Sequence, residues 1–473
     1  MPNLPDAQEV GISRSSAPIE SPGTRVLVTG ATGYIGGRLV PRLIERGWRV
    51  RVMVRDSTRI ETRPWAADVD IRTGDLFVPS SLVKAMEGMD AAYYLVHSMC
   101  SGHDYADSDR RAATNFVRAG KDLQRVIYLG GLLPDSPATS EHLQSRAEVG
   151  RILSDGLPTL EMRAGPIVGS GSASFEMVRY LTERLPILIG PSWIRNEVQP
   201  IAIRDMISYL TQALDSEITG VLEVGGDPIS FRQMLEDYAE ARGLKRVILL
   251  AKPILPPRFV ASSVELVTGL PRSLVTALLE GIIHPVLADT TRARNLFPEV
   301  VPLSYRAAVD LALKRTRKRM VETHWHGSFD RCRTYRMTDR EGSRRETRSV
   351  WIPASPKRVF QEVNRLDGDR GWLAGSWGEA LGQWKVEASE TPKLLRLRAE
   401  MRMPGEAWLQ FETIPEDGGT RLVQRLLFEP VGLPGVAYWY AFYPMRRVFL
   451  GRLVRSLARR AEVGGPEHRP PLP

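Results

Sequence analysis

The sequence has 473 residues, of which 43% are hydrophobic and 25% are charged. This composition is typical of a globular protein and excludes a disordered or fibrous chain, and the length predicts about two or three domains. Lysine and arginine number 64 against 55 aspartates and glutamates, which gives a net charge of +9. Because the arginines are mostly scattered along the chain, we predict no nucleic-acid partner.

The two cysteines, Cys100 and Cys332, are too few for a disulfide framework. Residues 1–23 are rich in Pro, Ser and Gly and contain no apolar stretch typical of a secretion signal. The most apolar long stretch, residues 247–270, is interrupted by charges and prolines and does not predict a membrane-spanning helix. We therefore expect a cytoplasmic protein with a disordered leader at 1–23 and a disordered tail at 466–473.

From residue 24 onward, short β-branched stretches alternate with helical patterns. Strands are expected at 25–30, 48–55, 69–76, 90–98, 125–131, 159–169 and 220–226, and helices after residue 36, at 81–88 and at 110–121. Such alternation predicts an α/β fold, a Rossmann doubly wound parallel sheet with helices on both faces. This first domain is expected to cover residues 24–315.

A second pattern follows the basic stretch 314–319, which we interpret as a solvated helix end or linker. Residues 343–353 predict a strand, and residues 355–366 predict a helix with proline at its first position. Four further strand patterns and a long closing helix complete the chain. We expect a linker at 316–330 and an α+β helix-grip domain, a curved sheet wrapped on a helix, at 331–465.

A glycine-rich turn lies between the first predicted strand and the first predicted helix. Its glycines follow the spacing G-x-x-G-x-x-G within a unit of the length of a βαβ dinucleotide site. Glycine lets backbone N–H groups approach a pyrophosphate, which then lies at the positive end of the helix dipole. The predicted cofactor loop comprises Gly30, Thr32, Gly33, Tyr34, Ile35 and Gly36.

The ends of the next strands predict the rest of the cofactor site. Arg55, at the tip of the second strand, is suited to the 2′-phosphate of NADP, whereas a shift of one residue would place Asp56 there and favour NAD. Asp75 and Leu76 are expected beside the adenine. Leu95, Val96 and His97 are expected beside the linking phosphates and the nicotinamide ribose, although His97 is equally well interpreted as a structural histidine.

Several motifs occur in a family-specific order: TGATGYIG, VRD, GDL, YYLVHSM, PIAIRD and GGDP. In this order residues 24–310 resemble the atypical or extended short-chain dehydrogenase/reductase superfamily, especially its NmrA-like and sugar-nucleotide epimerase-like members. The whole pattern resembles a group of bacterial two-domain NAD(P)-binding proteins whose C-terminal half has no known function. Residues 330–465 resemble START-like and polyketide-cyclase-like domains, which implies a cavity for an apolar ligand.

Active members of the superfamily carry a Tyr-x-x-x-Lys pair, and the equivalent positions here hold His142 and Arg146. The usual serine is replaced by Gly130 or Gly131. One interpretation makes His142 the proton donor, since its ordinary pKa is near 6.5, and gives Arg146 the positive charge and the ribose contacts. The other is that the pocket keeps the cofactor but has lost carbonyl chemistry. The sequence leaves both open.

Two features of the C-terminal half bear on the size of its predicted cavity and on its predicted partners. The segment between residues 365 and 386 is short for the family, which predicts a smaller or more open cavity. In the closing helix, Phe449, Leu453 and Leu457 share one face while the arginines lie off it. This stripe is expected either to pack on the sheet or, as a basic amphipathic helix, to contact the inner face of the membrane peripherally.

His324 and His326 have no third ligand at a suitable spacing, so we predict no metal. The sequence as a whole predicts an NADP-preferring oxidoreductase or epimerase-like enzyme, with NAD as the alternative cofactor and an unknown apolar or lipid-like small molecule as substrate. The alternative is a non-catalytic NADP(H)-binding sensor or a carrier of a hydrophobic ligand. Nothing in the sequence predicts the oligomeric state.

Overall fold

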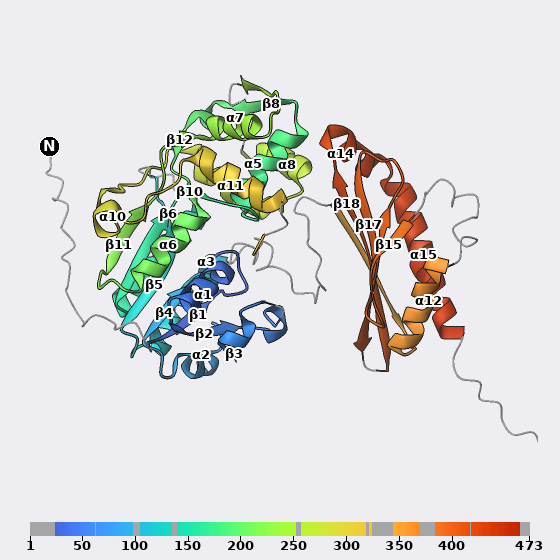
Figure 1. Ribbon diagram of the computed structural model, residues 1–473, viewed down its shortest axis with the longest axis horizontal. Coiled ribbons are helices and arrows are strands. Elements are labelled where there is room, and N and C mark those ends of the chain that lie inside the picture. Colours follow the sequence, from blue (N-terminus) through green and yellow to red (C-terminus); the bar gives the residue numbers. More distant parts are fainter. Residues whose placement is uncertain are drawn as a thin grey trace, which may run out of the picture. The chain divides into compact units, whose positions relative to one another are not determined.

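The computed structural model describes residues 24–61, 63–97, 105–134, 140–251, 257–317, 321–323, 344–368, 384–416 and 418–463. The chain divides into two compact units, Met1–Arg333 and Thr334–Pro473, which are taken in turn below (Figure 1). The expected leader, the tail and most of the linker lie outside the described residues. Within the described part of the chain, no helix has the length and apolar character needed to cross a bilayer.

The N-terminal unit is built on a parallel sheet in the order β11-β6-β5-β4-β1-β2-β3. Its strands are β1 (Arg25–Thr29), β2 (Arg49–Val54), β3 (Asp70–Thr73), β4 (Ala91–Tyr94), β5 (Arg125–Gly131), β6 (Thr159–Ala164) and β11 (Gly220–Val224). The predicted parallel α/β sheet is confirmed. The single strand expected at 159–169 is wrong, because Gly165 and Pro166 interrupt it and proline lacks the N–H that a sheet requires. Its second part is β7 (Ile167–Val168), which pairs with β10 (Ile201–Ala202).

Helices cover both faces of this sheet (Figure 1). Because strand side chains alternate, Val26 and Val28 join a core with α1 (Gly36–Glu45) and α6 (Ile203–Ala213). Leu27, between them, joins a separate core on the other side. That second core is closed by α2 (Pro79–Met86), α3 (Tyr105–Ala119) and α4 (Glu141–Gly156).

The remainder of the N-terminal unit has its own hydrophobic core beside the carboxyl end of the sheet. It is formed by α5 (Ala173–Arg184), α7 (Phe231–Ala241), α8 (Pro257–Thr268), α9 (Arg272–Ile283) and α11 (Tyr305–Arg317), with the short strands β8 (Ile187–Pro191), β9 (Glu197–Val198), β12 (Ile229–Ser230) and β13 (Val247–Ala251), whereas α10 (Thr291–Leu296) contacts β11 and places Ala293 in the core of α1 and α6. Among these helices, α5 and α9 border the cavity described below.

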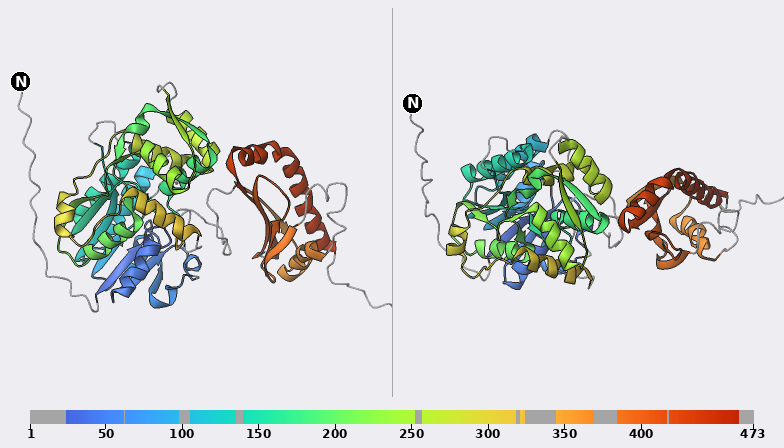
Figure 2. Two further views of the ribbon diagram at one scale, coloured as in Figure 1. Left: turned by 45° about the horizontal axis from the view of Figure 1, so that its top comes forward. Right: turned by 90° about the horizontal axis from the view of Figure 1, so that it is seen from above.

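The C-terminal unit is an antiparallel sheet in the order β14-β18-β17-β16-β15 with helices on one face (Figure 2). Its elements are β14 (Arg344–Ile352), α12 (Pro356–Gly368), β15 (Trp384–Glu390), β16 (Leu394–Ala399), β17 (Gly405–Glu416), β18 (Gly419–Pro430), α14 (Gly432–Ala441) and α15 (Tyr443–Val463). Leu453 and Leu457 of α15 are buried in its core, with Phe449 packed against them, so the predicted apolar stripe packs on the sheet. Most of the short segment noted at 365–386 lies outside the described residues.

Candidate functional site

The glycine loop after β1 has no room for side chains at two of its positions. Gly30 adopts a positive φ of 76°, and a Cβ on it would lie 2.5 Å from the carbonyl oxygen of Leu95. A Cβ on Gly36 would lie 2.4 Å from the carbonyl oxygen of Gly30. The turn is closed by the amide of Gly33, which donates to Gly30 O at 2.9 Å. Glycine is therefore required by the local packing as well as by the turn.

Helix α1 starts directly from this loop and presents its amino-terminal end to a cavity of about 290 Å³. Ile35 is the N-cap residue, and no side chain caps the first turn among the described residues. The uncapped amides and the helix dipole suit a pyrophosphate, so the loop fits a dinucleotide. The loop residues that line the cavity are Gly30, Gly33, Tyr34, Ile35 and Gly36, whereas Thr32 is not among them.

The loop is held from outside by a residue that the sequence analysis missed. Thr323, which is 1% exposed, donates its hydroxyl to the carbonyl oxygen of Tyr34 at 2.8 Å. The same hydroxyl accepts from Nε of Arg38 at 2.8 Å, and Nη2 of Arg38 donates to Ser170 O at 2.7 Å. A threonine so far along the chain has no local sequence signal, because only the fold brings it to α1.

Arg55 and Asp56 follow the end of β2, and their side chains have different surroundings. The Asp56 carboxylate accepts from the amide and the hydroxyl of Thr58, at 3.0 and 2.7 Å, and so caps the short helical turn that follows. The side chain of Arg55 is exposed at the strand tip. The carboxylate of Asp56 is therefore already engaged by its own turn.

Asp75 and Leu76 follow β3 but do not line the cavity. The Asp75 carboxylate accepts from the amide of Phe77 at 3.0 Å, and the Leu76 side chain is 6% exposed within the core beneath α2 and α3. The carbonyl of Leu76 accepts from Asn115 at 3.0 Å. The side chains of both residues therefore contact their immediate surroundings: Asp75 accepts a hydrogen bond from the next turn, and Leu76 packs in the core.

At the nicotinamide end, the structure brings the ends of β4 and β5 to the first turns of α4. Leu95, Val96, His97, His142 and Arg146 all line the same cavity as the glycine loop. The rings of His97 and His142 meet edge to face with centroids 6.4 Å apart. The predicted cofactor and catalytic residues of this end are therefore adjacent.

Two hydrogen bonds hold Arg146 at the wall of the cavity. Its Nη2 donates to the carbonyl of Leu129, and its own carbonyl accepts from the Tyr128 hydroxyl at 3.0 Å. The first of these bonds fixes the guanidinium at the cavity wall, beside the predicted ribose position.

The pKa of His142 differs from the ordinary value on which its predicted role as a proton donor was based. Burial, with the positive charge of Arg146 second, lowers the pKa of His142 to about 3, far from the ordinary value near 6.5. Near neutral pH the imidazole is therefore uncharged. A neutral imidazole can donate one hydrogen bond and accept another, but it does not carry the extra proton of an imidazolium acid.

The strand end that holds a serine in active relatives has no hydroxyl here. Gly130 and Gly131 both line the cavity. A Cβ on Gly130 would lie 2.8 Å from Oε1 of Glu161, so the buried glutamate occupies the space of a side chain. A Cβ on Gly131 would lie 3.1 Å from Leu143, a tight contact.

The part of the cavity wall that α9 contributes is apolar and was not foreseen from the sequence. Helix α9 and the chain after it contribute Leu274, Ala277, Leu278, Gly281 and Val286 to the cavity. No local motif marks these residues, since their role depends on how the second core of the unit packs beside the sheet. Among the described residues there is no cluster of three potential metal ligands, and His324 and His326 lie outside them.

Comparisons with known proteins agree with this geometry. Residues 30–155 match a family described as NAD(P)H-binding, and residues 364–452 match a family described only as a protein of unknown function. The C-terminal match therefore assigns no START-like identity.

Two curated relatives resemble the N-terminal unit. A ceramide reductase from Caulobacter vibrioides is 28% identical over 240 residues, which cover 48% of this chain and 74% of that protein. The noscapine synthase SDR1 of Papaver somniferum is 24% identical over 183 residues, covering 35% of this chain and 51% of that protein.

Among solved structures, the Bordetella bronchiseptica enzyme WbmH in complex with NAD+ is 16% identical with a TM-score of 0.48. It covers 63% of this chain and 99% of its own length. The glycine loop and the parallel sheet agree with the match of residues 30–155 to the NAD(P)H-binding family, so the N-terminal unit has the features of an NAD(P)-binding Rossmann domain.

Proposed function

We propose that this protein is an NADP(H)-preferring oxidoreductase that acts on an apolar, lipid-like carbonyl or alcohol. The observation that carries the proposal is that one cavity joins the glycine loop, the His142–Arg146 pair and the aliphatic wall of α9. A cofactor site, polar groups and an apolar substrate wall are the three parts that such a reaction needs. The name of the Caulobacter relative, a ceramide reductase, supports an apolar substrate.

Two residues of the chain have defined roles in this proposal. The bound nicotinamide would supply or accept the hydride. Arg146 stabilises negative charge on the substrate oxygen and contacts the ribose, because its guanidinium is fixed at the cavity wall. His142 donates its ring N–H to the same oxygen and takes up a proton from solvent at its other nitrogen, since it is neutral at physiological pH.

The preference for NADP rests on the tip of β2. Arg55 is exposed there, whereas the Asp56 carboxylate is bound by Thr58. A guanidinium suits a 2′-phosphate, and an engaged carboxylate is poorly placed to accept from a 2′-hydroxyl.

The first test is binding of NADPH and NADH to the full chain by nucleotide fluorescence, followed by mass spectrometry of copurifying small molecules. We expect tighter binding of NADPH, and an apolar carbonyl or alcohol that is converted with the cofactor. In the His142→Gln variant, turnover should fall while nucleotide binding is retained. Binding of neither nucleotide would overturn the cofactor assignment, and unchanged turnover in His142→Gln would remove its catalytic role.

The second candidate function is a non-catalytic NADP(H) sensor or hydrophobic-ligand carrier. The neutral state of His142 and the lack of a hydroxyl at Gly130 and Gly131 favour it, because the usual proton donor is missing. Nucleotide binding without hydride exchange on any copurifying compound would support this function over catalysis.

For the C-terminal unit we propose a START-like helix-grip domain, on the basis of its antiparallel sheet and its packed terminal helix. A cytoplasmic location remains a prediction, as does peripheral contact with an anionic membrane. Exposed Phe442, between α14 and α15, and exposed Tyr443 and Val448 of α15 support membrane contact. Pelleting of the full chain with anionic liposomes, compared with a variant in which exposed Tyr443 and Val448 are both replaced by Ser, would test it.

A further inference from the structure

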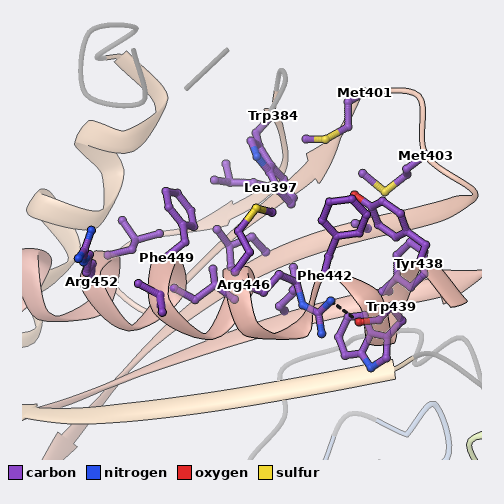
Figure 3. Close-up of a pocket in the computed structure, with 18 residues that line it drawn as sticks. Trp384, Leu397, Met401, Met403, Tyr438, Trp439, Phe442, Arg446, Phe449 and Arg452 are labelled. Atoms are coloured by element: carbon purple, nitrogen blue, oxygen red, sulfur yellow. Dashed lines mark hydrogen bonds between the residues drawn. The ribbon is translucent and has the colours of Figure 1, made fainter. Parts of the chain in front are cut away.

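The C-terminal unit contains a cavity of about 420 Å³ between its sheet and helices α14 and α15 (Figure 3). This volume is within the range of small-molecule sites. The walls are almost entirely apolar and aromatic. Residues at the wall include Trp384, Leu397, Met403, Leu426, Tyr438 and Phe449.

One charged side chain is buried at this wall. Arg446, whose side chain is 11% exposed, has its guanidinium carbon 3.7 Å from the ring centre of Trp439 and donates to the Trp439 carbonyl at 2.6 Å (Figure 3). Its Nε lies 3.4 Å from the Glu346 carboxylate. Within the described part of the chain, its Nη2 is buried and has no hydrogen-bond partner.

The neighbouring strand adds a second cation to the same face of the sheet. Glu346 and Arg348 of β14 lie opposite Leu426 and Gln424 of β18, so their side chains share the face that carries the cavity. Arg348 pairs with Glu346, the carboxylate that Arg446 also approaches. Nη1 of Arg348 and the side-chain amide of Gln424 are buried without a partner among the described residues.

This group of Glu346, Arg348 and Arg446 therefore carries one more positive than negative charge. A buried cation without a matching anion is unfavourable, and so are buried donors without acceptors. A purely apolar ligand would leave the cation unmatched and the donors without acceptors. An acidic group would supply both a negative charge and hydrogen-bond acceptors. Burial is also the main cause of the lowered pKa of Arg446.

We propose that the cavity of the C-terminal unit binds a single-chain amphiphile with an acidic head group, whose apolar chain fills the cavity and whose acid binds Arg446. This site is separate from the nucleotide site and does not rest on the proposed oxidoreductase activity. It gives the C-terminal unit a ligand of defined chemistry.

The test is isothermal titration calorimetry of the full chain, without nucleotide, against three probes that share one alkyl chain: dodecanoate, dodecanol and dodecyltrimethylammonium. We expect dodecanoate to bind at least about 10-fold more tightly than dodecanol, because a hydrogen bond to a charged group contributes that much. The cationic probe should bind most weakly. Equal binding of acid and alcohol would overturn the assignment of Arg446.

Variants locate the site. Arg446→Gln should weaken dodecanoate binding by about 10- to 100-fold and leave dodecanol binding within about 3-fold. Arg447→Gln is the matched control, because Arg447 is the exposed next residue and does not line the cavity. Ala407→Trp, which fills the cavity, should abolish binding of both probes; unchanged binding would place the ligand elsewhere and overturn the proposal.

A further variant keeps the proposal testable if Arg446→Gln does not fold. Glu346→Gln removes the anion that competes for Arg446, so dodecanoate should bind more tightly and dodecanol equally. Weaker dodecanoate binding in Glu346→Gln would contradict the proposal. Binding of dodecanoate with no binding of NADPH would support this site and overturn only the proposed function of the N-terminal unit.

Discussion

At the scale of single residues, the proposed preference for NADPH depends on Arg55. We predict that Arg55→Gln weakens NADPH binding by about 10- to 100-fold and leaves NADH binding nearly unchanged, because only NADPH carries the 2′-phosphate. Fluorescence titration with both nucleotides measures the effect. Arg72→Gln is the control, since Arg72 pairs with Asp70 within β3. Equal losses for both nucleotides would show that Arg55 does not read the 2′-phosphate.

His142 gives the protein a pH-dependent stability. Its folded pKa of about 3 lies below the unfolded value near 6.5, so the unfolded chain takes up the proton first as pH falls. The stability present above pH 6.5 should therefore be lost progressively toward pH 3, by at most about 1.4 kcal/mol per pH unit. We expect His142→Gln to lose less stability than the wild type between pH 7 and pH 5. Urea denaturation at the two pH values checks this, and parallel losses would argue against it.

At the scale of elements, the segment around Thr323 stabilises the start of α1. Thr323→Val keeps the shape but removes an acceptor from buried Arg38 and a donor to the Tyr34 carbonyl. We predict a loss of about 1–3 kcal/mol in the free energy of unfolding and weaker binding of both nucleotides. Chemical denaturation and nucleotide titration measure the two effects.

Thr114→Val is the matched control for this element. The Thr114 hydroxyl donates to a carbonyl of its own helix, that of Arg110, at 2.8 Å. A variant at Thr323 that behaved like the one at Thr114 would show that the loop does not need this contact.

The elements also show what the sequence can and cannot predict. The strand, glycine loop and helix of the first βαβ unit were predictable. Gly30, Gly36 and the regular spacing of apolar residues on either side of them can be recognised within a short stretch of sequence. Thr323 and the α9 wall were not, since Thr323 meets Tyr34 across 289 residues of sequence. The altered pKa of His142 also depends on burial, which no residue pattern around position 142 reports.

At the scale of the whole molecule, the chain consists of two compact units with separate cores. We predict that NADPH raises the unfolding temperature of the N-terminal unit alone, because a ligand stabilises only the unit that binds it. Excess NADPH at about 100 times its Kd would add about 2.7 kcal/mol to that unit. Differential scanning calorimetry with and without NADPH follows both transitions, and equal shifts would mean that the two units unfold together.

The strand order of the parallel sheet has a consequence for how the chain folds. Strand β11 pairs with β6, although residues 165–219 lie between them and build much of another core. Pairing across so long a loop is slow, so β11 is expected to be the last strand to join the sheet. Until then the edge of β6 is open to pairing with other chains. During synthesis, a ribosome that stalls before residue 220 would therefore present an aggregation-prone edge, and expression at low temperature or with chaperones should increase the yield of soluble protein.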